Sequence, residues 1–488
     1  MKTLYDIVII GSGPGGYRAA ILAALRKQKV AIIEKQDWGG CCLNRGCVPK
    51  KTWHNTAKLL SKNKSLKKIG ICGELKPDFN RAWQHQKDTV TTVRNNYLSY
   101  MKRLGIDYFN GHGKIAEPFS ENNNAKTKKI ISINIIGQDA QLLNTKHVII
   151  ATGATAYRPQ FCTTSGNKVL STDDIFDRLP PEGNDVAIIG GGVIAVEFSY
   201  ILQALGKNIY WYSRSPALSK SDFSEQAIKL LKEQLGNLSL TSTQVLPDSI
   251  VEREGKVHLC FNDSRLNQSV DWVLLATGRI PFSTNLGLEN TRVKQDADGF
   301  IKTNQYLETN ETGIYAIGDV RCREMTANHA INDANIAVEN IINGNHQGSN
   351  ENWVPQAIYS ALEMAKVGLN EDQAEDLDYE PAVGFSAFES SPCAIGQDST
   401  EGYMRLIADM DSGELLGGEI VGENAAELIQ LMAMHKDTKT ALRAFSELTV
   451  NHPSRAEELV NATETLANKW GLADFVFPTD IKLGSSEK

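Results

Sequence analysis

The sequence predicts an α/β protein with two Rossmann-like units and a C-terminal part of α+β type. Three observations predict this architecture. A strand, a glycine-rich turn and a helix follow one another twice, each copy closes with a strand that runs into Ala-Thr-Gly, and the last third mixes strand and helix patterns. The chain of 488 residues is also longer than one hydrophobic core usually supports.

The first copy begins near the N-terminus. An apolar β-branched run at 5–10 predicts a strand, residues 17–25 predict a helix, and the apolar run at 30–33 predicts a second strand. The segment HVIIATGA closes this copy at Ala154. Such a strand–turn–helix–strand order is the βαβ unit of a parallel sheet.

The turn of the first copy carries Gly11, Gly13 and Gly16, a GxGxxG pattern. Glycines at these places let backbone N–H groups approach a pyrophosphate at a helix N-terminus. Glu34 follows 23 residues after Gly11, at the end of the second strand, where a carboxylate can accept hydrogen bonds from ribose hydroxyls. The alternative is a tight turn in an unrelated α/β unit.

The second copy begins at Asp185 with VAIIG, continues with GGVIAVEFSYILQALG and NIYWYS, and closes with DWVLLATGR at Arg279. Its turn carries Gly190, Gly192 and Ala195, and alanine is allowed at the third place.

Ser213 stands in the second copy where Glu34 stands in the first, so the ribose carboxylate is absent there. Arg214 follows directly, and Lys220 comes six residues later. A missing acid with a base nearby suits a 2′-phosphate better than a free 2′-hydroxyl. The alternative is that both cationic side chains only face solvent.

Composition excludes several classes of protein. Fifty-one basic and 58 acidic residues give a net charge of −7, which removes the electrostatic case for nucleic-acid binding. No apolar run approaches the roughly 20 residues that cross a bilayer. The N-terminus lacks a cleavable leader pattern, so we expect a cytoplasmic protein without a membrane segment.

The intervening stretches are polar. Residues 121–129 predict a hairpin tip, 180–185 mark the entry into the second copy, and 343–352 predict a linker before the C-terminal third. In that third, YMRLIADM and LLGGEIVG predict strands and residues 425–436 predict a long helix.

Three of the eight cysteines, Cys41, Cys42 and Cys47, lie within seven residues. Pro49 suits the first turn of a helix, which places Cys47 at its N-terminus, where the helix dipole stabilises a thiolate. Cys42 and Cys47 can close a disulfide if the loop bends, and Gly46 permits the bend. A pairing of Cys41 with Cys47 stays open. Zinc would need two further ligands that do not follow at the usual spacing, so no metal is expected.

A redox disulfide together with two dinucleotide units forms a coherent set. One dinucleotide would be a flavin, because a flavin can pass electrons between a dithiol and a nicotinamide.

From residue 4 to about residue 470, the sequence closely resembles the flavin-dependent pyridine nucleotide–disulfide oxidoreductases. The family includes dihydrolipoamide dehydrogenase, glutathione reductase and mercuric reductase. The segments that carry the resemblance are GSGPGGYRAA, GGCCLNRGCVPKK, the two Ala-Thr-Gly segments, GGGVIAVE, IYAIGD at 314–319 and HPSRAEE at 452–458.

The resemblance implies FAD on the first copy and a nicotinamide cofactor, NAD or NADP, on the second. Residues that match FAD-contacting positions are Gly11, Gly13, Gly16, Glu34, Gly153 and Asp319, the last of which would bind the ribityl chain. Lys50 and Lys51 fall at the lysine position near the flavin, and Glu197 falls at its acidic partner. The positions assigned to NAD(P) are Gly190, Gly192, Ala195, Glu197, Ser213, Arg214, Lys220 and Gly278, and the local residues favour acceptance of NADP.

The resemblance also assigns the catalytic groups. Cys42 matches the outer cysteine, which exchanges with substrate, and Cys47 matches the inner cysteine, which meets the flavin. His452 matches the catalytic base, and Glu457 matches the carboxylate that orients it. In this family the base reaches the site from the other subunit, so a homodimer is implied.

The expected domains follow from these assignments. They are an FAD-binding domain at 1–155 and 280–350, an NAD(P)-binding domain at 156–279, a dimerisation domain at 351–475 and a tail at 476–488.

The substrate is less sharply indicated. GSGPGGY and ELLGGEIVGENAAELIQ look like dihydrolipoamide dehydrogenases, whereas GCVPKK, IAVE, HPSRAEELV and Arg214 look like glutathione reductases. Ile21 and Asn335 stand where glutathione reductases carry substrate-holding arginines, and Cys41 replaces the usual threonine. Leu362 stands where a proline is common, and the ending GSSEK lacks the C-terminal thiols of mercuric and large thioredoxin reductases.

We therefore expect a dihydrolipoamide dehydrogenase whose partner is a lipoyl domain or a lipoyl carrier protein. The first alternative is an NADPH-dependent reductase of a non-glutathione disulfide. The second, from another class, is a structural flavoprotein whose disulfide is not catalytic.

Overall fold

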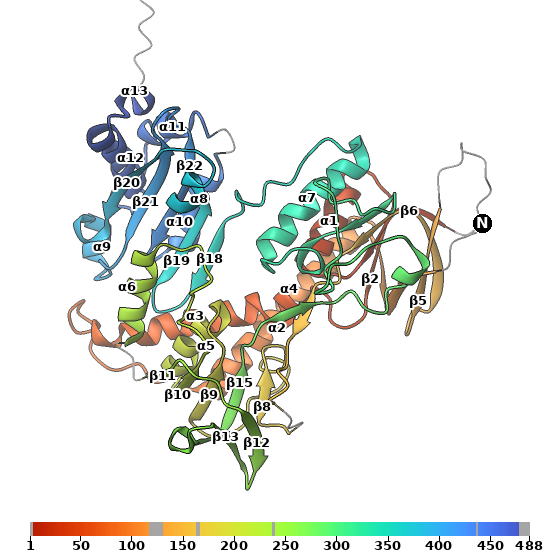
Figure 1. Ribbon diagram of the computed structural model, residues 1–488, viewed down its shortest axis with the longest axis horizontal. Coiled ribbons are helices and arrows are strands. Elements are labelled where there is room, and N and C mark those ends of the chain that lie inside the picture. Colours follow the sequence, from red (N-terminus) through yellow and green to blue (C-terminus); the bar gives the residue numbers. More distant parts are fainter. Residues whose placement is uncertain (1–2, 117–129, 163–165, 237–239, 436–437, 478–488) are drawn as a thin grey trace, which may run out of the picture. The chain divides into compact units, whose positions relative to one another are not determined.

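The computed structural model describes residues 3–116, 130–162, 166–236, 240–435 and 438–477 (Figure 1). These residues divide into two compact units. The larger unit comprises residues 1–61, 75–219 and 239–350, and the smaller unit comprises residues 62–74, 220–238 and 351–488. The hairpin tip predicted at 121–129 lies outside the described residues.

The first sheet of the larger unit has seven strands in the order β3-β2-β1-β6-β5-β4, and β17 also pairs with β6. Strands β1, β2, β3, β6 and β17 run parallel, while β5 and β4 continue as an antiparallel meander. Their bounds are β1 (Leu4–Ile10), β2 (Val30–Glu34), β3 (Asp107–Asn110), β4 (His112–Ile115), β5 (Ile131–Ile136), β6 (Gln141–Ile150) and β17 (Ile314–Ala316).

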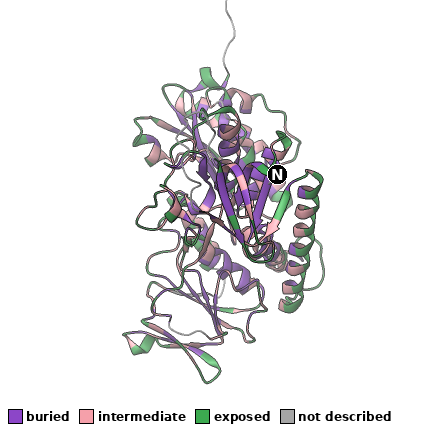
Figure 2. Ribbon diagram, turned by 90° about the vertical axis from the view of Figure 1, so that its right-hand side faces the viewer, coloured by how far each residue is buried: buried purple, intermediate pink, exposed green. Residues whose placement is uncertain are grey.

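Both faces of this sheet are covered, which is why β1 is apolar on both sides. Ile7 and Ile9 belong to a core shared with helices α1 (Pro14–Leu25) and α7 (Ala327–Asn343). Ile10, on the other face, belongs to a second core that includes residues of the meander. In Figure 2 the strands in the middle of the molecule are coloured as buried along most of their length.

The second sheet has the order β11-β10-β9-β15-β8 and is parallel throughout. Its strands are β8 (Val169–Ser171), β9 (Asp185–Ile189), β10 (Asn208–Tyr212), β11 (Leu240–Thr243) and β15 (Trp272–Leu275), and helix α5 (Val193–Ala204) follows β9. The strand–turn–helix–strand succession of the first sheet thus recurs, which confirms the fold class that the sequence predicts.

Two small sheets complete the larger unit. The strands β12 (Ser249–Arg253), β13 (Lys256–Cys260) and β14 (Gln268–Val270) form one, and β7 (Ala154–Ala156) and β16 (Arg279–Pro281) form the other. Helices α2 (Gly40–Arg45), α3 (Cys47–Ser61) and α4 (Phe79–Arg103) follow β2, and α3 begins at Cys47 as Pro49 predicts.

The smaller unit is built on an antiparallel sheet with the order β18-β19-β22-β21-β20. Its strands are β18 (Gln356–Tyr359), β19 (Glu363–Gly368), β20 (Pro381–Ala387), β21 (Tyr403–Asp409) and β22 (Leu415–Val421). Its helices are α6 (Glu225–Gly236), α8 (Glu371–Glu375), α9 (Pro392–Gly396), α10 (Ala425–Ala433), α11 (Ala441–Ser446), α12 (Glu457–Trp470) and α13 (Ala473–Val476).

The C-terminal predictions differ from the structure at two boundaries. Both predicted strands are present as β21 and β22. The linker predicted at 343–352 overlaps α7 by one residue, Asn343, and its remaining residues form no helix or strand. The helix predicted at 425–436 ends at Ala433, because Met434 is 77% exposed and no longer belongs to the apolar face of α10. None of the helices in the described ranges has the length and apolar character needed to span a membrane.

Candidate functional site

The first glycine turn is shaped by backbone contacts that exclude side chains. Gly11 has φ +104°, and a Cβ there would lie 2.3 Å from the carbonyl oxygen of Ala151. A Cβ on Gly16 would lie 1.9 Å from the carbonyl oxygen of Gly11, so helix and strand can pack this closely only with glycine.

Gly13 has a different role, because nothing lies within 4 Å of the position that its Cβ would take. It is the N-cap of α1, which has no side-chain cap and no acidic residue in its first turn. No side chain caps the first N–H groups of α1, and the field at this helix end favours an anion. This geometry fits a dinucleotide pyrophosphate.

Glu34 lies at the end of β2 and is 8% exposed. Its Oε2 accepts hydrogen bonds from the N–H of Ser12 at 2.9 Å and from the hydroxyl of Ser12 at 2.7 Å, and its Oε1 accepts one from the N–H of Gln36 at 2.9 Å. A carboxylate has about four acceptor positions, so it can still accept from a ribose hydroxyl.

Asp319 and Gly153 are the other positions expected to meet FAD. Asp319 lies in a 3₁₀ turn, Gly318–Val320, directly after β17, and burial raises the pKa of its carboxyl group although the charge of Arg279 acts in the opposite direction. Gly153 has φ +70° with open space at its Cβ position. The residues expected to hold FAD therefore fit such a group.

The second glycine turn repeats the backbone geometry of the first. Gly190 has φ +135°, and a Cβ there would lie 2.1 Å from the carbonyl oxygen of Ala276. Gly192 is the uncapped N-cap of α5, with open space at its Cβ position. Ala195 is fully buried in α5, and Gly278 has φ +107° with open space beside it. This turn too can receive a pyrophosphate.

The ribose position of the second copy is occupied differently from that of the first. Ser213 is 4% exposed, and its hydroxyl donates to the carbonyl oxygen of Ser215 at 2.7 Å. Arg214 and Lys220 are both exposed. The hydroxyl proton of Ser213 is therefore already used in this hydrogen bond.

The cysteine cluster lies at the junction of α2 and α3. Cys42 and Cys47 form a disulfide with 4.7 Å between their Cα atoms, and Cys41 is not part of it. Cys47 is the first residue of α3 and is exposed, whereas Cys42 is partly buried. The pairing therefore follows the sequence prediction.

An ion pair between a lysine and a glutamate connects α3, the helix that begins at Cys47, to the second copy. The Nζ of Lys50 lies 2.6 Å from Oε1 of Glu197, and their side chains are 16% and 2% exposed. Lys51 is partly buried. The resemblance placed both Lys50 and Lys51 at the lysine position near the flavin. This ion pair joins Lys50 to Glu197 on α5.

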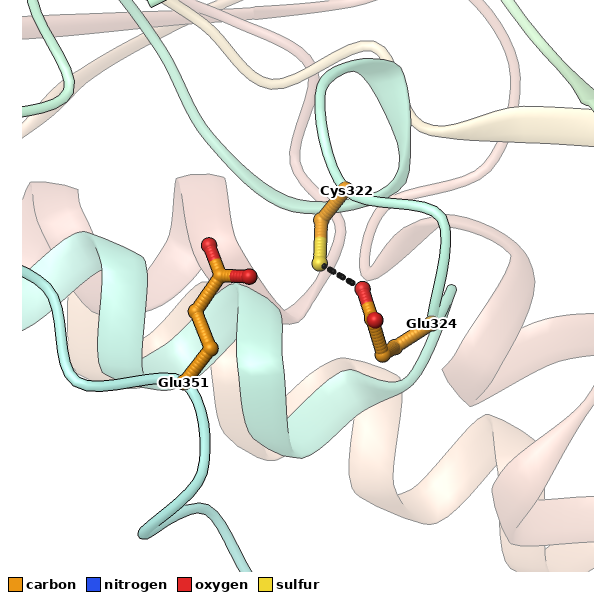
Figure 3. Close-up of side chains that lie close together, drawn as sticks. All are labelled: Cys322, Glu324 and Glu351. Atoms are coloured by element: carbon orange, nitrogen blue, oxygen red, sulfur yellow. Dashed lines mark hydrogen bonds between the residues drawn. The ribbon is translucent and has the colours of Figure 1, made fainter. Parts of the chain in front are cut away.

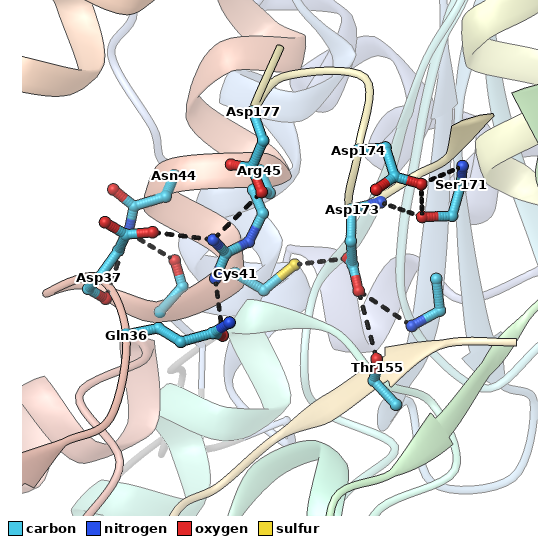
Figure 4. Close-up of polar contacts among 12 residues, drawn as sticks. Gln36, Asp37, Cys41, Asn44, Arg45, Thr155, Ser171, Asp173, Asp174 and Asp177 are labelled. Atoms are coloured by element: carbon cyan, nitrogen blue, oxygen red, sulfur yellow. Dashed lines mark hydrogen bonds and ion pairs between the residues drawn. The ribbon is translucent and has the colours of Figure 1, made fainter. Parts of the chain in front are cut away.

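Cys41 belongs to a polar network beside the disulfide (Figure 4). Its thiol donates to Oδ1 of Asp173 at 3.5 Å, and Arg279 donates to the same oxygen at 2.8 Å. Burial raises the pKa of the Cys41 thiol to about 11. This network could not be predicted from the sequence, because Asp173 and Arg279 are far from the cysteine cluster along the chain.

Cys322 is a buried thiol that, like Cys41, donates a hydrogen bond to a carboxylate (Figure 3). Its Sγ lies 2.7 Å from Oε2 of Glu324, and burial together with that carboxylate raises the pKa of the thiol.

His452 and Glu457 lie together in the smaller unit. Nδ1 of His452 is 2.7 Å from Oε1 of Glu457, and the N–H of Ser454 donates to Oε2 of Glu457 at 2.8 Å. The hydrogen bond with His452 lowers the pKa of Glu457. The His452 side chain is 73% exposed, so Nε2 can face a substrate thiol while Nδ1 is held by the carboxylate.

The glycine turns, the disulfide and the C-terminal histidine define a class of protein, and comparison with known proteins gives the same class. The profile described as pyridine nucleotide-disulphide oxidoreductase matches residues 5–334, and the profile of the dimerisation domain of the same family matches residues 354–463. The chain belongs to the pyridine nucleotide-disulphide oxidoreductase family. It is therefore an enzyme of a family that uses FAD and a nicotinamide cofactor, which leaves the structural flavoprotein without support.

Individual relatives carry two different names. A dihydrolipoyl dehydrogenase of Bacillus subtilis is 29% identical over 470 residues, which is 95% of this chain and 98% of the relative. A glutathione reductase of Burkholderia cepacia is 30% identical over 472 residues, covering 95% and 99%. Among solved structures, LpdA from Mycobacterium tuberculosis superposes with a TM-score of 0.86 at 20% identity, covering 95% of this chain and 99% of that one.

Proposed function

We propose that the protein is a dihydrolipoamide dehydrogenase, which oxidises the dihydrolipoyl group of a lipoyl domain or lipoyl carrier protein and reduces NAD(P)⁺. The observation that carries the proposal is the disulfide between Cys42 and Cys47, placed in one unit with two uncapped glycine turns. Relatives named dihydrolipoyl dehydrogenase in Bacillus subtilis and Corynebacterium glutamicum, at 29% and 30% identity, support the choice of substrate.

In this proposal Cys42 exchanges with the substrate and Cys47 faces the flavin. The two S–H bonds of the dihydrolipoyl group break and one S–S bond forms in it, while the Cys42–Cys47 bond breaks and leaves a dithiol. FAD, when bound at Gly11, Gly13, Gly16, Glu34, Gly153 and Asp319, supplies a carrier that takes the electron pair from the dithiol to NAD(P)⁺, with release of NAD(P)H and a proton.

His452 is the proposed base, acting across the interface of a homodimer. It removes the first thiol proton at Nε2, because Nδ1 is engaged by Glu457. An ionised Glu457 stabilises the imidazolium that forms, and its lowered pKa keeps it ionised at neutral pH. The dimerisation profile at 354–463 contains both residues and supports this arrangement.

Lys50 and Glu197 are proposed to lie beside the flavin ring. The proposed FAD-binding domain comprises residues 1–155 and 280–350, the NAD(P)-binding domain 156–279 and the dimerisation domain 351–475. For the nicotinamide cofactor, Gly190, Gly192, Ala195 and Gly278 would hold the pyrophosphate side. Arg214, with Lys220, would meet a 2′-phosphate.

A second candidate is an NADPH-dependent reductase of a non-glutathione disulfide. It is favoured by the exposed Arg214 and the absent carboxylate at Ser213. Ile21 on α1 is 6% exposed, and Asn335 accepts a hydrogen bond from Arg18 at 3.2 Å. Neither position therefore carries the arginine that the resemblance associates with binding of glutathione.

Steady-state assays of the full chain distinguish the candidates. Dihydrolipoamide is combined with NAD⁺ or NADP⁺, and oxidised glutathione and lipoamide are combined with NADH or NADPH. We expect turnover with dihydrolipoamide and none with glutathione. Reduction of another disulfide by NADPH, without any dihydrolipoamide oxidation, would replace the proposal by the second candidate.

His452→Gln tests the base. It should lower turnover by roughly 10²–10⁴-fold while FAD stays bound. His346→Gln is the matched control, because His346 is also an exposed histidine that lies near a carboxylate, at 3.6 Å from Glu339. Near-normal turnover of His452→Gln would remove this residue from the mechanism.

A further inference from the structure

Residues 171–177, which we call the acidic turn, begin at the last residue of β8 and contact α2, the helix that carries Cys42. Oδ1 of Asp173 accepts from the thiol of Cys41 at 3.5 Å, and Oδ2 of Asp177 lies 3.5 Å from Nη1 of Arg45 (Figure 4). The two aspartates are four residues apart, and so are their partners on α2. Two contacts at one helical spacing fix both the position and the rotation of α2.

The acidic turn also contacts the helix that begins with Cys47. Phe176 is fully buried, and its ring centroid lies 4.8 Å from that of Trp53, which is fully buried on α3. One short segment therefore touches both helices whose sulfurs form the disulfide.

The turn itself is rigidly held. Oδ2 of Asp174 accepts from the N–H and from the hydroxyl of Ser171, each at 2.7 Å. The N–H of Asp173 donates to the hydroxyl of Ser171 at 3.3 Å. A side chain that satisfies the first N–H groups of a turn reduces its freedom in the way an N-cap does for a helix.

Asp173 also accepts hydrogen bonds from groups outside α2. Arg279 donates to Oδ1 at 2.8 Å, and the N–H of Ala156 donates to Oδ2 at 3.0 Å. Arg279 also donates to the carbonyl oxygen of Ala154 at 2.7 Å. Burial raises the pKa of Asp173, but the charge and hydrogen bond of Arg279 outweigh it, so the pKa lies below its ordinary value.

Cys41 is suited to donate a hydrogen bond and poorly suited to exchange disulfides. A pKa of about 11 leaves the thiol protonated at neutral pH, and the thiolate is the form that attacks a disulfide. Its neighbour Asp173 is an ionised acceptor, which a thiol can satisfy and a thiolate would repel.

We propose that the acidic turn is a positioning element for the Cys42–Cys47 disulfide, and that Cys41 is its hydrogen-bonded contact on α2 instead of a third redox thiol. The proposal rests on the redox role of this disulfide. Holding α2 and α3 together keeps the two sulfurs at high effective concentration, which favours the closed disulfide over the dithiol. A negative charge near the cysteines acts in the same direction, because it disfavours a thiolate.

The test measures the equilibrium between the disulfide and the dithiol in dithiothreitol buffers, by alkylation and mass spectrometry of the full chain. Cys41→Thr keeps a donor of similar size, Cys41→Val removes the donor, and Asp173→Asn removes the charge. Asp263→Asn is the matched control, because Asp263 pairs with Arg265 at the surface. The readout uses no lipoyl substrate, so failure of the proposed function leaves it intact.

We expect Cys41→Val and Asp173→Asn to shift the equilibrium about tenfold toward the dithiol, which is about 30 mV for a two-electron couple. Cys41→Thr and Asp263→Asn should stay within twofold of the parent. Asp177→Asn gives a smaller shift in the same direction, and it serves if Asp173→Asn does not fold.

Three outcomes would overturn the proposal. The first is a Cys41→Thr protein that shifts as far as Cys41→Val, because the thiol itself would then be required. The second is a Cys41→Val protein that matches the parent. The third is a parent enzyme whose peptide map shows Cys41 joined to Cys42 or Cys47.

Discussion

The two glycine turns have the same backbone conformation and differ in the side chains that surround it. The N–H of Gly11 donates to the carbonyl oxygen of Ile33, and that of Gly190 donates to the carbonyl oxygen of Tyr212, each at 2.8 Å. Both turns end in an uncapped helix with open space at the N-cap glycine. The features that would receive a pyrophosphate are therefore built from main chain, and both copies retain them.

The differences lie where a side chain would select the cofactor. The first copy has the buried Glu34, whereas the second has Ser213 followed by the exposed Arg214. The third glycine is kept as Gly16 in one turn and replaced by the buried Ala195 in the other. Backbone geometry therefore sets the kind of ligand, while one or two side chains set which member of that kind binds.

The largest effect is expected from breaking the backbone of each turn separately. Gly11→Ala forces a Cβ to 2.3 Å from the backbone of Ala151 at φ +104°, so the turn must open. We expect loss of most bound FAD, measured by flavin absorbance, and a lower melting temperature.

Gly190→Ala produces a similar clash in the second copy, with the carbonyl oxygen of Ala276 at 2.1 Å. It should retain FAD and lose affinity for the nicotinamide cofactor. If Gly190→Ala also lost FAD, the two turns would not be the independent sites that the comparison assumes.

A smaller effect is expected at the ion pair that connects the two copies. Lys50→Met removes the cationic partner of the buried Glu197, and such a loss destabilises a protein by about 3–5 kcal/mol. Glu197→Gln keeps a hydrogen-bond acceptor and removes the buried charge, so it should cost less. Thermal unfolding of both variants and the double variant measures the coupling. Equal and additive losses would contradict a direct pair.

The smallest effect is expected at the ribose position of the second copy. Arg214→Ala should raise the Michaelis constant for NADP(H) about tenfold, because one charge-assisted hydrogen bond is worth about 1.5–3 kcal/mol. The constant for NAD(H) should change less than twofold. Ser213→Glu, which copies Glu34, should move preference toward NAD(H). Equal effects of Arg214→Ala on both cofactors, or no use of NADP(H) by the parent, would return the enzyme to the NAD-linked group.

The sequence predicted those features whose cause is local. The glycines of both turns and the start of α3 at Cys47 follow from residue types a few positions apart. The local residues allowed the Cys42–Cys47 pair but left a pairing of Cys41 with Cys47 open, and the resemblance favoured the pair that the structure shows. The long C-terminal helix was predicted too long, because apolar composition extends beyond the last buried turn of α10.

The features that the sequence did not predict depend on partners distant in the chain. Asp173 lies 132 residues from Cys41, and nothing in the segment 171–177 distinguishes it from an ordinary acidic loop. Helix α6 has an apolar face of Ala227, Leu231 and Leu235, which indicates that this face packs against another element of the protein. That its residues group with the C-terminal sheet is a property of the fold alone.

The pairing of β7 with β16 bears on the origin of the protein. Residues 154–156 leave the first sheet and residues 279–281 return toward it, and the two segments lie side by side as antiparallel partners, with Ala156 opposite Arg279. The chain therefore departs and returns at one place. Because its two ends are neighbours, the intervening segment is compatible with a single insertion that leaves the host sheet undisturbed.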